Sequence, residues 1–126
     1  MSTLAPSQTI KRDDLRDELY FSIGGFWPHE EMLGFLNDLS RAAGPFIKAK
    51  KPFVSIGNFT DFVPQNRETA EAIRDSLLLA AKNGLKRFAV VNAAPLVTLQ
   101  YRRITKDMDV EFFETESAAR AWLHAD

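Results

Sequence analysis

The sequence contains no cysteine among its 126 residues, so disulfides, thiolate catalysis, cysteine zinc sites and iron–sulfur clusters are excluded. It has only two histidines, His29 and His124, which cannot form a dedicated histidine metal site, and we expect neither a metal nor a cofactor. It also lacks an excess of either charge. Sixteen basic and seventeen acidic residues give a formal net charge of -1, so no bulk electrostatic attraction favours nucleic acid or an anionic membrane.

Long hydrophobic runs are missing too. The longest uninterrupted apolar run is residues 77–81, far short of the roughly 18 residues that a membrane span requires. The first ten residues lack the basic region, apolar core and small-residue cleavage site of a secretory signal. We therefore expect no membrane span and a cytoplasmic location.

The overall composition indicates one ordinary globular domain. Hydrophobic residues make up 45% of the chain and charged residues 26%, which is typical of a folded α/β domain rather than a disordered or fibrous chain. The polar start of the chain, which carries Pro6, predicts a flexible tail over residues 1–8. Residues 9–126 are then expected to form the domain.

The first third of the chain predicts two strands and a helix. Aromatic and β-branched residues over 19–23, followed by two glycines, indicate a strand, and residues 9–12 could pair with it as an antiparallel edge. Pro28 suits the first turn of a helix, with acidic residues after it. Gly44-Pro45 predicts that this helix ends near Ala43.

The middle of the chain predicts a central strand followed by the clearest helix. Residues 53–57 are apolar enough for a strand buried on both faces, and residues 58–64 are expected to form a loop. Asn66 is placed to cap the next helix, which Asn83-Gly84 ends. The helical spacing predicts an inner face of Ala70, Ile73, Leu77 and Ala81.

The last third repeats the alternation of strand and helix. We predict strands at 88–92 and 110–113, and a helix from Pro95 with Leu96, Leu99, Arg103 and Ile104 on one stripe, although Val97-Thr98 would also tolerate a strand. A final helix from Thr115 or Ser117 is expected to bury Trp122 against the sheet. Strands joined by helices run parallel, so the fold class is α/β, a single domain with a mostly parallel sheet of four or five strands and a possible antiparallel N-terminal edge.

The sequence contains partial matches to catalytic and cofactor-binding motifs, but none of them is complete. His29-Glu30 begins like a zinc-protease helix, but Leu33 occupies the position of the required second histidine. Gly24-Gly25 follows a strand as in dinucleotide sites, yet Phe26-Trp27 stand where a phosphate needs bare backbone. The sequence also has no phosphate-binding loop, nucleophile elbow or calcium loop. We therefore predict no catalytic residue.

Polar residues after the central strand form the candidate binding site, because ligands of open α/β sheets bind at the carboxyl ends of the strands. Asp61 is expected to orient this loop by accepting backbone N–H bonds, with an anionic or carbonyl-bearing partner at the helix N-terminus. Two basic clusters, at 48–51 and 102–106, are interpreted as solvated faces, so we expect no nucleic-acid binding. The six candidate binding residues are Asn58, Thr60, Asp61, Gln65, Asn66 and Thr69.

The order of elements from Leu19 to Leu123, the segment 53–81 and the ending 110–123 resemble the STAS fold family in its SpoIIAA-like branch, also described as STAS and lipid-transfer-like. This resemblance implies a nonenzymatic domain. Anti-sigma-factor antagonists of the fold bind a kinase and are switched by phosphorylation of a serine at the start of the helix after a central strand. Gln65 and Asn66 stand nearest that place here, so the phosphorylatable serine is absent.

Three functional hypotheses follow. The first is a regulatory domain that binds a protein partner through residues 58–75 and self-associates. The second is a domain that holds a small apolar or lipid-like molecule between the sheet and the first two helices, and a filled core there would exclude it. The third is a small enzyme that uses Asp61 and His29 together.

Overall fold

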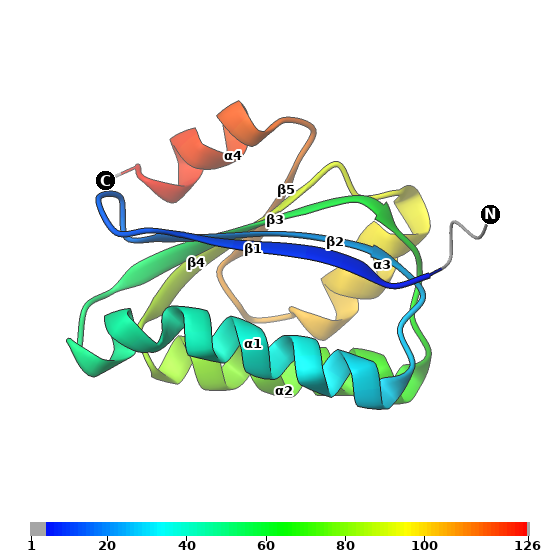
Figure 1. The fold of residues 1–126 in the computed structure, drawn as a ribbon. Coiled ribbons are helices and arrows are strands. Elements are labelled where there is room, and N and C mark those ends of the chain that lie inside the picture. Colours follow the sequence, from blue (N-terminus) through cyan, green and yellow to red (C-terminus); the bar gives the residue numbers. More distant parts are fainter. Residues whose placement is uncertain (1–4, 126) are drawn as a thin grey trace.

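The computed structural model describes residues 5–125 as one five-stranded sheet with helices on both faces (Figure 1). The sheet order is β1-β2-β3-β4-β5; β1 is antiparallel to β2 and the other neighbours are parallel. This confirms the predicted α/β class and the antiparallel N-terminal edge. The elements are β1 (Ser7–Asp13), β2 (Glu18–Gly25), α1 (His29–Lys48), β3 (Phe53–Phe62), α2 (Arg67–Lys82), β4 (Leu85–Val91), α3 (Pro95–Ile104), β5 (Val110–Phe113) and α4 (Glu116–Leu123).

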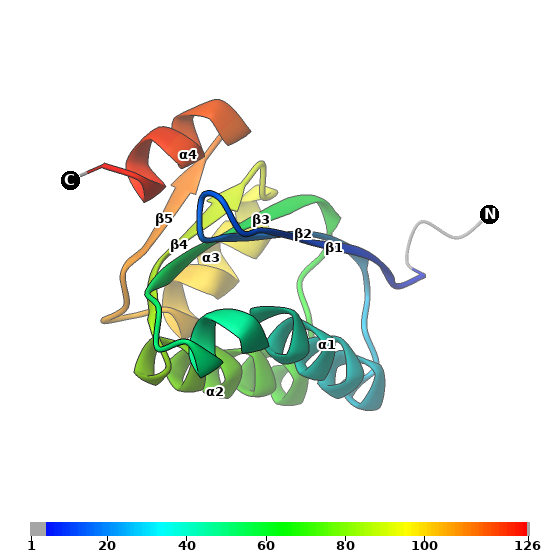
Figure 2. The ribbon, with the colours of Figure 1, turned by 60° about the vertical axis from the view of Figure 1, so that its left-hand side comes forward.

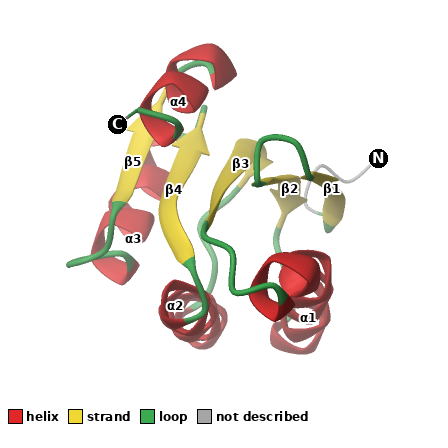
Figure 3. Cartoon of the chain, turned by 90° about the vertical axis from the view of Figure 1, so that its left-hand side faces the viewer, coloured by secondary structure: helices red, strands yellow, loops and turns green. Residues whose placement is uncertain are grey.

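The helices are divided unequally between the two faces of the sheet. Helices α1 and α2 lie side by side beneath it together with α3, whereas α4 lies alone on the opposite face (Figures 2 and 3). Alternate residues of β2, β3, β4 and β5 therefore enter two separate cores, one large and aromatic, the other small. Strand β1 begins at Ser7 and so includes the last two residues assigned to the tail, while residues 1–4 lie outside the described residues. Within 5–125, no helix is both long and apolar enough to span a membrane.

Helix α1 does not end near Ala43, as predicted, but continues through Gly44-Pro45 to Lys48. Pro45 removes only one intrahelical N–H bond, close to the C-terminal end of the helix. One turn of additional helix buries Phe46, whose ring stacks on Phe53 with centroids 5.2 Å apart. Burial of a phenylalanine offsets the loss of one hydrogen bond, so tertiary packing overrides the local terminator.

The predicted loop at 58–64 is also wrong, because β3 extends to Phe62. The end of the strand stays paired with β2, where Gly24 and Gly25 lie opposite Asp61 and Phe62. Phe62 is buried at 2% exposure. The polar residues of this stretch led to the loop prediction. Burial of its apolar residues and pairing with β2 nevertheless make it a strand.

Two helical faces differ from their predicted positions. In α2, Ala81 is exposed, while Ala70 and Ile73 are buried as expected. In α3, which is a helix as predicted, Leu96 and Leu99 are 66% and 60% exposed. Its buried residues are instead Val97 and Tyr101. Two apolar stripes compete in this short sequence, and the one with the aromatic ring packs against the sheet.

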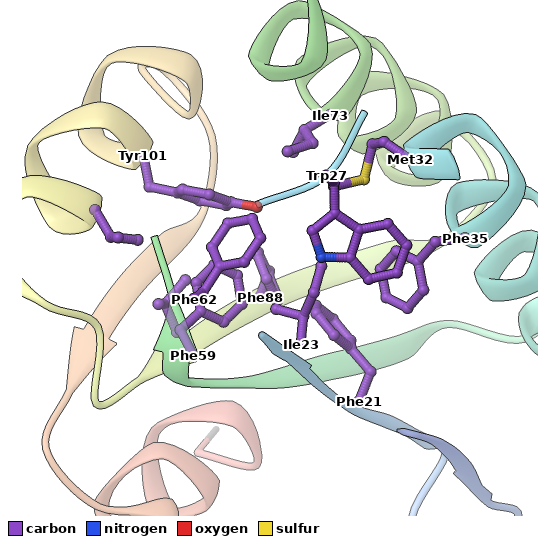
Figure 4. Close-up of a cluster of buried hydrophobic side chains, with 12 residues drawn as sticks. Phe21, Ile23, Trp27, Met32, Phe35, Phe59, Phe62, Ile73, Phe88 and Tyr101 are labelled. Carbon is purple, nitrogen blue, oxygen red and sulfur yellow. The ribbon is translucent and has the colours of Figure 1, made fainter. Parts of the chain in front are cut away.

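The large core contains a layer of aromatic rings between the sheet and the helices (Figure 4). The Phe21 ring stacks on Phe88 with centroids 5.8 Å apart, and Phe59 meets Tyr101 edge to face at 4.8 Å. Gly57 makes room for these rings, since a Cβ there would lie 2.6 Å from Phe21 and 2.7 Å from Phe59. The aromatic layer thus requires glycine in the central strand.

Helix α4 covers the small core through Ala119 and Leu123, which are both buried. Trp122 is only half-buried, which makes the prediction of a buried tryptophan wrong. Its ring packs on Phe113 at 5.7 Å and beneath the Arg87 guanidinium at 5.2 Å. The helix is rotated so that the smaller residues meet the sheet and the indole covers their edge.

We expect Leu123→Ala to destabilise the protein more than Trp122→Ala. Leu123 is 4% exposed, so its truncation leaves a cavity that costs about 2 to 5 kcal/mol. Trp122 retains solvent contact, and its loss is expected to cost about 1 to 3 kcal/mol. Urea denaturation of both variants measures the difference. A larger loss for Trp122→Ala would contradict the orientation of α4 described above.

Candidate functional site

The six predicted binding residues fall into two groups with different surroundings. Gln65, Asn66 and Thr69 surround the start of α2 and make hydrogen bonds that hold the fold together. Asn58, Thr60 and Asp61 lie on β3 near its carboxyl end. The structure therefore brings these residues to the same edge of the sheet but leaves only some of them accessible.

Gln65 is 6% exposed and connects the β2–α1 loop with the β3–α2 loop. Its Oε1 accepts the Trp27 N–H at 2.8 Å, and its Nε2 donates to the Gly25 carbonyl at 3.1 Å and to the Val63 carbonyl at 2.6 Å. Its backbone N–H and C=O are in turn paired with the Gln100 side chain at 2.8 and 2.7 Å. This side chain is fully used in fixing two loops and is not available to a ligand.

Asn66 and Thr69 also have structural roles. Asn66 caps α2, as predicted, because its Oδ1 accepts the Thr69 N–H at 2.9 Å. Thr69 is fully buried, and its hydroxyl donates to the Trp27 carbonyl at 3.3 Å. These contacts tie the first turn of α2 to the start of α1.

Asn58, Thr60 and Asp61 form the strand-end surface, the accessible part of the predicted site. The Asn58 Oδ1 accepts the Thr60 N–H and hydroxyl at 3.0 and 2.6 Å, while Thr60 Oγ1 accepts from Asn92 Nδ2 at 3.1 Å. Asp61 is exposed, and within residues 5–125 its carboxylate accepts none of the backbone N–H bonds expected of it. The loop is oriented by Gln65 instead.

A second polar network, not anticipated from the sequence, joins α4 to the sheet. The Glu18 carboxylate is 3% exposed and bonds Arg120 at 3.1 Å and His124 at 3.0 Å. Burial lowers the pKa of Arg120, but the hydrogen bonds and charges of Glu18 and Glu116 outweigh it and raise that pKa overall. Burial, together with Glu116, raises the pKa of the Tyr20 hydroxyl. Every charge in this network has a partner, so the network anchors α4 to the sheet.

The hypothesis of a small enzyme gains no geometric support from the described residues. His29 Nε2 lies 3.4 Å from Glu68 on α2, and the interactions within 5–125 include no hydrogen bond or ion pair between His29 and Asp61. The same part of the chain contains no group of three or more metal-ligating side chains.

A cavity of about 400 Å³ lies between α1, α2 and the sheet. We call it the α1–α2 cavity. It lies between the two aromatic clusters that pack α1 on the sheet, one around Trp27 and Phe35, the other formed by Phe46 and Phe53. Its deeper lining comes from both helices, the strands and α3, and includes Leu19, Phe21, Met32, Leu36, Ile73, Leu77, Phe88 and Tyr101.

Two buried hydroxyls, those of Ser55 and Tyr101, line this cavity, and its other polar residues are exposed or half-buried. Asn37 and Ser40 of α1 and Asp75 of α2 line it and are exposed to solvent. Leu33 and Leu79, which are 42% and 59% exposed, extend the apolar lining outward at the rim. The hollow is therefore an apolar groove with a polar border, which is the usual form of a small-molecule site.

The sequence predicted where an apolar cleft would lie but not that one would be open. Leu36, Leu77 and Ile73 were recognisable as inward-facing from their helical spacing. Periodicity does not report how far a helix stands from the sheet, because that distance depends on the side chains between them. The core beneath α1 and α2 is not filled, so the condition that would exclude an apolar ligand is not met.

Comparison with known proteins supports the fold alone. No protein-family model matches the chain. No curated protein matches it either. The chain is similar to the crystal structure of an uncharacterised protein of the DUF3478 family, with a SpoIIAA-like fold, from Shewanella loihica PV-4. The two share 23% sequence identity with a TM-score of 0.66, over 98% of each chain. The chain has a SpoIIAA-like fold, as the resemblance implied.

We expect Gln65→Ala to destabilise the protein by about 2 to 4 kcal/mol, because it leaves the buried Trp27 N–H and Gly25 carbonyl without their partner. Gln8→Ala, on the exposed part of β1, is the matched control and should change stability by no more than about 0.5 kcal/mol. Urea denaturation monitored by circular dichroism measures both. A loss below about 1 kcal/mol for Gln65→Ala would return Gln65 to the list of ligand-binding candidates.

Proposed function

We propose that this protein is a nonenzymatic binding domain that holds a small apolar molecule in the α1–α2 cavity. The observation that carries the proposal is the cavity itself. Its volume of about 400 Å³ falls within the range of about 300 to 1,000 Å³ typical of ligand sites, and its deep lining is apolar and aromatic.

An unfilled apolar cavity destabilises the folded protein, and a bound apolar ligand would remove this cost. Interiors of proteins are close-packed, and an unfilled apolar space deprives its lining of dispersion contacts. Leu36, Leu39 and Leu77 remain partly exposed around it, although each lies on the inward face of its helix. A bound apolar molecule would cover these side chains and stabilise the folded state in proportion to its affinity.

The nonenzymatic part of the proposal rests on the surroundings of the reactive side chains. His29 is paired with Glu68, and the buried Glu18 is paired with Arg120 and His124. None of these histidine and carboxylate groups lines the α1–α2 cavity. A ligand held there would meet no candidate acid–base pair.

A second candidate function is regulatory binding of a protein partner at the strand-end surface. The observation that favours it is the exposure of Thr60 and Asp61 at the carboxyl end of β3, next to the loop that leads into α2. In SpoIIAA-like antagonists this edge carries the phosphorylated serine. Here Gln65 and Asn66 stand nearest that position, so this role would work without the phosphorylation switch. The partner is then either another protein or, in a self-associating form, a second copy of the chain.

We expect the apolar fluorophore 1-N-phenylnaphthylamine to bind the purified protein, and Ala80→Phe to weaken that binding about tenfold or more. Ala80 lines the α1–α2 cavity, so a phenyl ring there occupies the space that the probe needs. A tenfold change corresponds to about 1.4 kcal/mol. Fluorescence titration measures the affinity, and a melting curve shows whether the filled variant stays folded.

Ala81→Phe is the matched control, since Ala81 is the exposed neighbour of Ala80 on α2 and does not line the cavity. This variant should bind the probe like the natural chain. Absence of probe binding by the natural chain, or equal binding by the Ala80→Phe and Ala81→Phe variants, would overturn the assignment of the cavity as the ligand site.

For the second candidate, we expect Asp61→Ala to reduce capture of a specific protein partner, or of a second copy of the chain, while leaving the melting temperature unchanged. Asp61 is exposed and has no structural hydrogen bond among the described residues, so its loss should affect recognition rather than folding. Glu111→Ala, an exposed carboxylate on β5, is the control. Affinity capture with quantitative mass spectrometry compares the three chains; equal capture by all of them would contradict this role.

A further inference from the structure

We propose that the Tyr101 hydroxyl is the polar recognition group of the α1–α2 cavity, and that the ligand is an uncharged apolar molecule carrying one hydrogen-bond acceptor such as a carbonyl oxygen. This inference rests on the proposed function, since it names the class of molecule that the cavity takes. It adds a specificity-determining residue that neither the sequence nor the fold comparison identified.

Tyr101 lies on α3, on the inward face that the sequence did not predict, and it lines the cavity. Its ring packs edge to face on Phe59 at 4.8 Å and on Phe62 at 6.2 Å. Figure 4 shows the hydroxyl at the far end of the ring, directed away from α3 toward Ile73 and Trp27. The aromatic layer thus fixes the ring and aims its polar end at the space between the sheet and the two helices.

The Tyr101 hydroxyl has no hydrogen-bond partner among the described residues. Tyrosine hydroxyls inside proteins are usually paired, because an unpaired buried polar group is unfavourable. The residue is 4% exposed, and its unpaired oxygen is not completely enclosed by protein atoms. Tyr101 lines the α1–α2 cavity, and its hydroxyl is directed toward Ile73, which also lines it, so a molecule inside the cavity can pair with the oxygen (Figure 4).

The other hydroxyl at the inner end of the cavity is already satisfied. Ser55, on β3, is 5% exposed, and its Oγ donates to the Leu19 carbonyl at 3.0 Å. The remaining polar lining residues are exposed or half-buried: Asn37, Ser40, Asp75, Ser76 and Asn83. Of the two buried hydroxyls in the described lining, that of Tyr101 is therefore the one without a protein partner.

The charge of the lining selects a neutral ligand. Among the described residues, no lysine, arginine or histidine lines the cavity, and its one charged residue is Asp75 at the rim. A buried carboxylate would have no cation to pair with, and moving an unpaired charge out of water is strongly unfavourable. Burial also raises the pKa of Tyr101 far above its usual range, so the hydroxyl keeps its proton and is able to donate.

The test uses three probes with the same ten carbon atoms: butylbenzene, the ketone 1-phenylbutan-1-one and the anion 4-phenylbutanoate. Each is titrated against the natural chain, Tyr101→Phe and Tyr20→Phe by displacement of 1-N-phenylnaphthylamine. Tyr101→Phe keeps the ring that packs on Phe59 and removes only the hydroxyl. Tyr20, whose hydroxyl contacts Glu116 on the opposite face of the sheet, provides the matched control.

We expect Tyr101→Phe to weaken ketone binding by about three- to tenfold, as expected for one hydrogen bond, and to leave butylbenzene binding unchanged. Butylbenzene binding also reports that the variant cavity is intact. Tyr20→Phe should alter neither affinity, and the anion should bind the natural chain most weakly. An equal change for ketone and hydrocarbon in Tyr101→Phe, or tighter binding of the anion than of the ketone, would overturn this inference while leaving the cavity as a ligand site. Failure of all three probes to bind the natural chain would overturn the proposed function and this inference with it.

Discussion

The aromatic layer between the sheet and α1, α2 and α3 is the constraint on which the rest of the structure depends. Its rings fill the space between the sheet and the helices, and Gly57 supplies the room that Phe21 and Phe59 need. One pair of rings, Phe46 and Phe53, supports the C-terminal end of α1, while Trp27 and Phe35 support its start. Phe35 and Phe53, one ring from each of these supports, line the α1–α2 cavity together with side chains of α2.

The β2–α1 and β3–α2 loops at the carboxyl edge of the sheet are held in place mainly by one side chain, that of Gln65. Gln65 pairs with backbone groups on both loops, so the start of α1 and the start of α2 keep a constant relative position. The resemblance to the antagonists implies that their phosphorylated serine would lie nearest to Gln65 and Asn66. Both amides have structural roles here, since Gln65 is buried between the loops and Asn66 caps α2.

The sequence did not allow the buried face of α3, the end of α1 and the end of β3 to be assigned correctly, for a common reason. Leu96 and Leu99 are as apolar as Val97 and Tyr101, and Gly44-Pro45 is a strong local terminator. In each case the observed structure is the one that buries an aromatic ring: Tyr101 in α3, Phe46 in α1 and Phe62 in β3. Helix propensities differ by up to about 0.7 kcal/mol for most residues, by about 1 for glycine and by about 3 for proline in a helix interior, whereas burial of each large apolar side chain contributes about 1.5 to 3 kcal/mol.

The sequence by itself determined the order of strands and helices, the mostly parallel sheet and the Asn66 cap, because these depend on periodicity, turn residues and short-range hydrogen bonds. It also placed polar residues at the carboxyl edge of the sheet. Only the tertiary structure decided which of them stay accessible: Gln65 and Thr69 became buried because two loops converge on them, while Asp61 stayed exposed. The cavity and the orientation of the Tyr101 hydroxyl were likewise decided there, since both depend on how side chains from six separate elements fill, or fail to fill, one shared space.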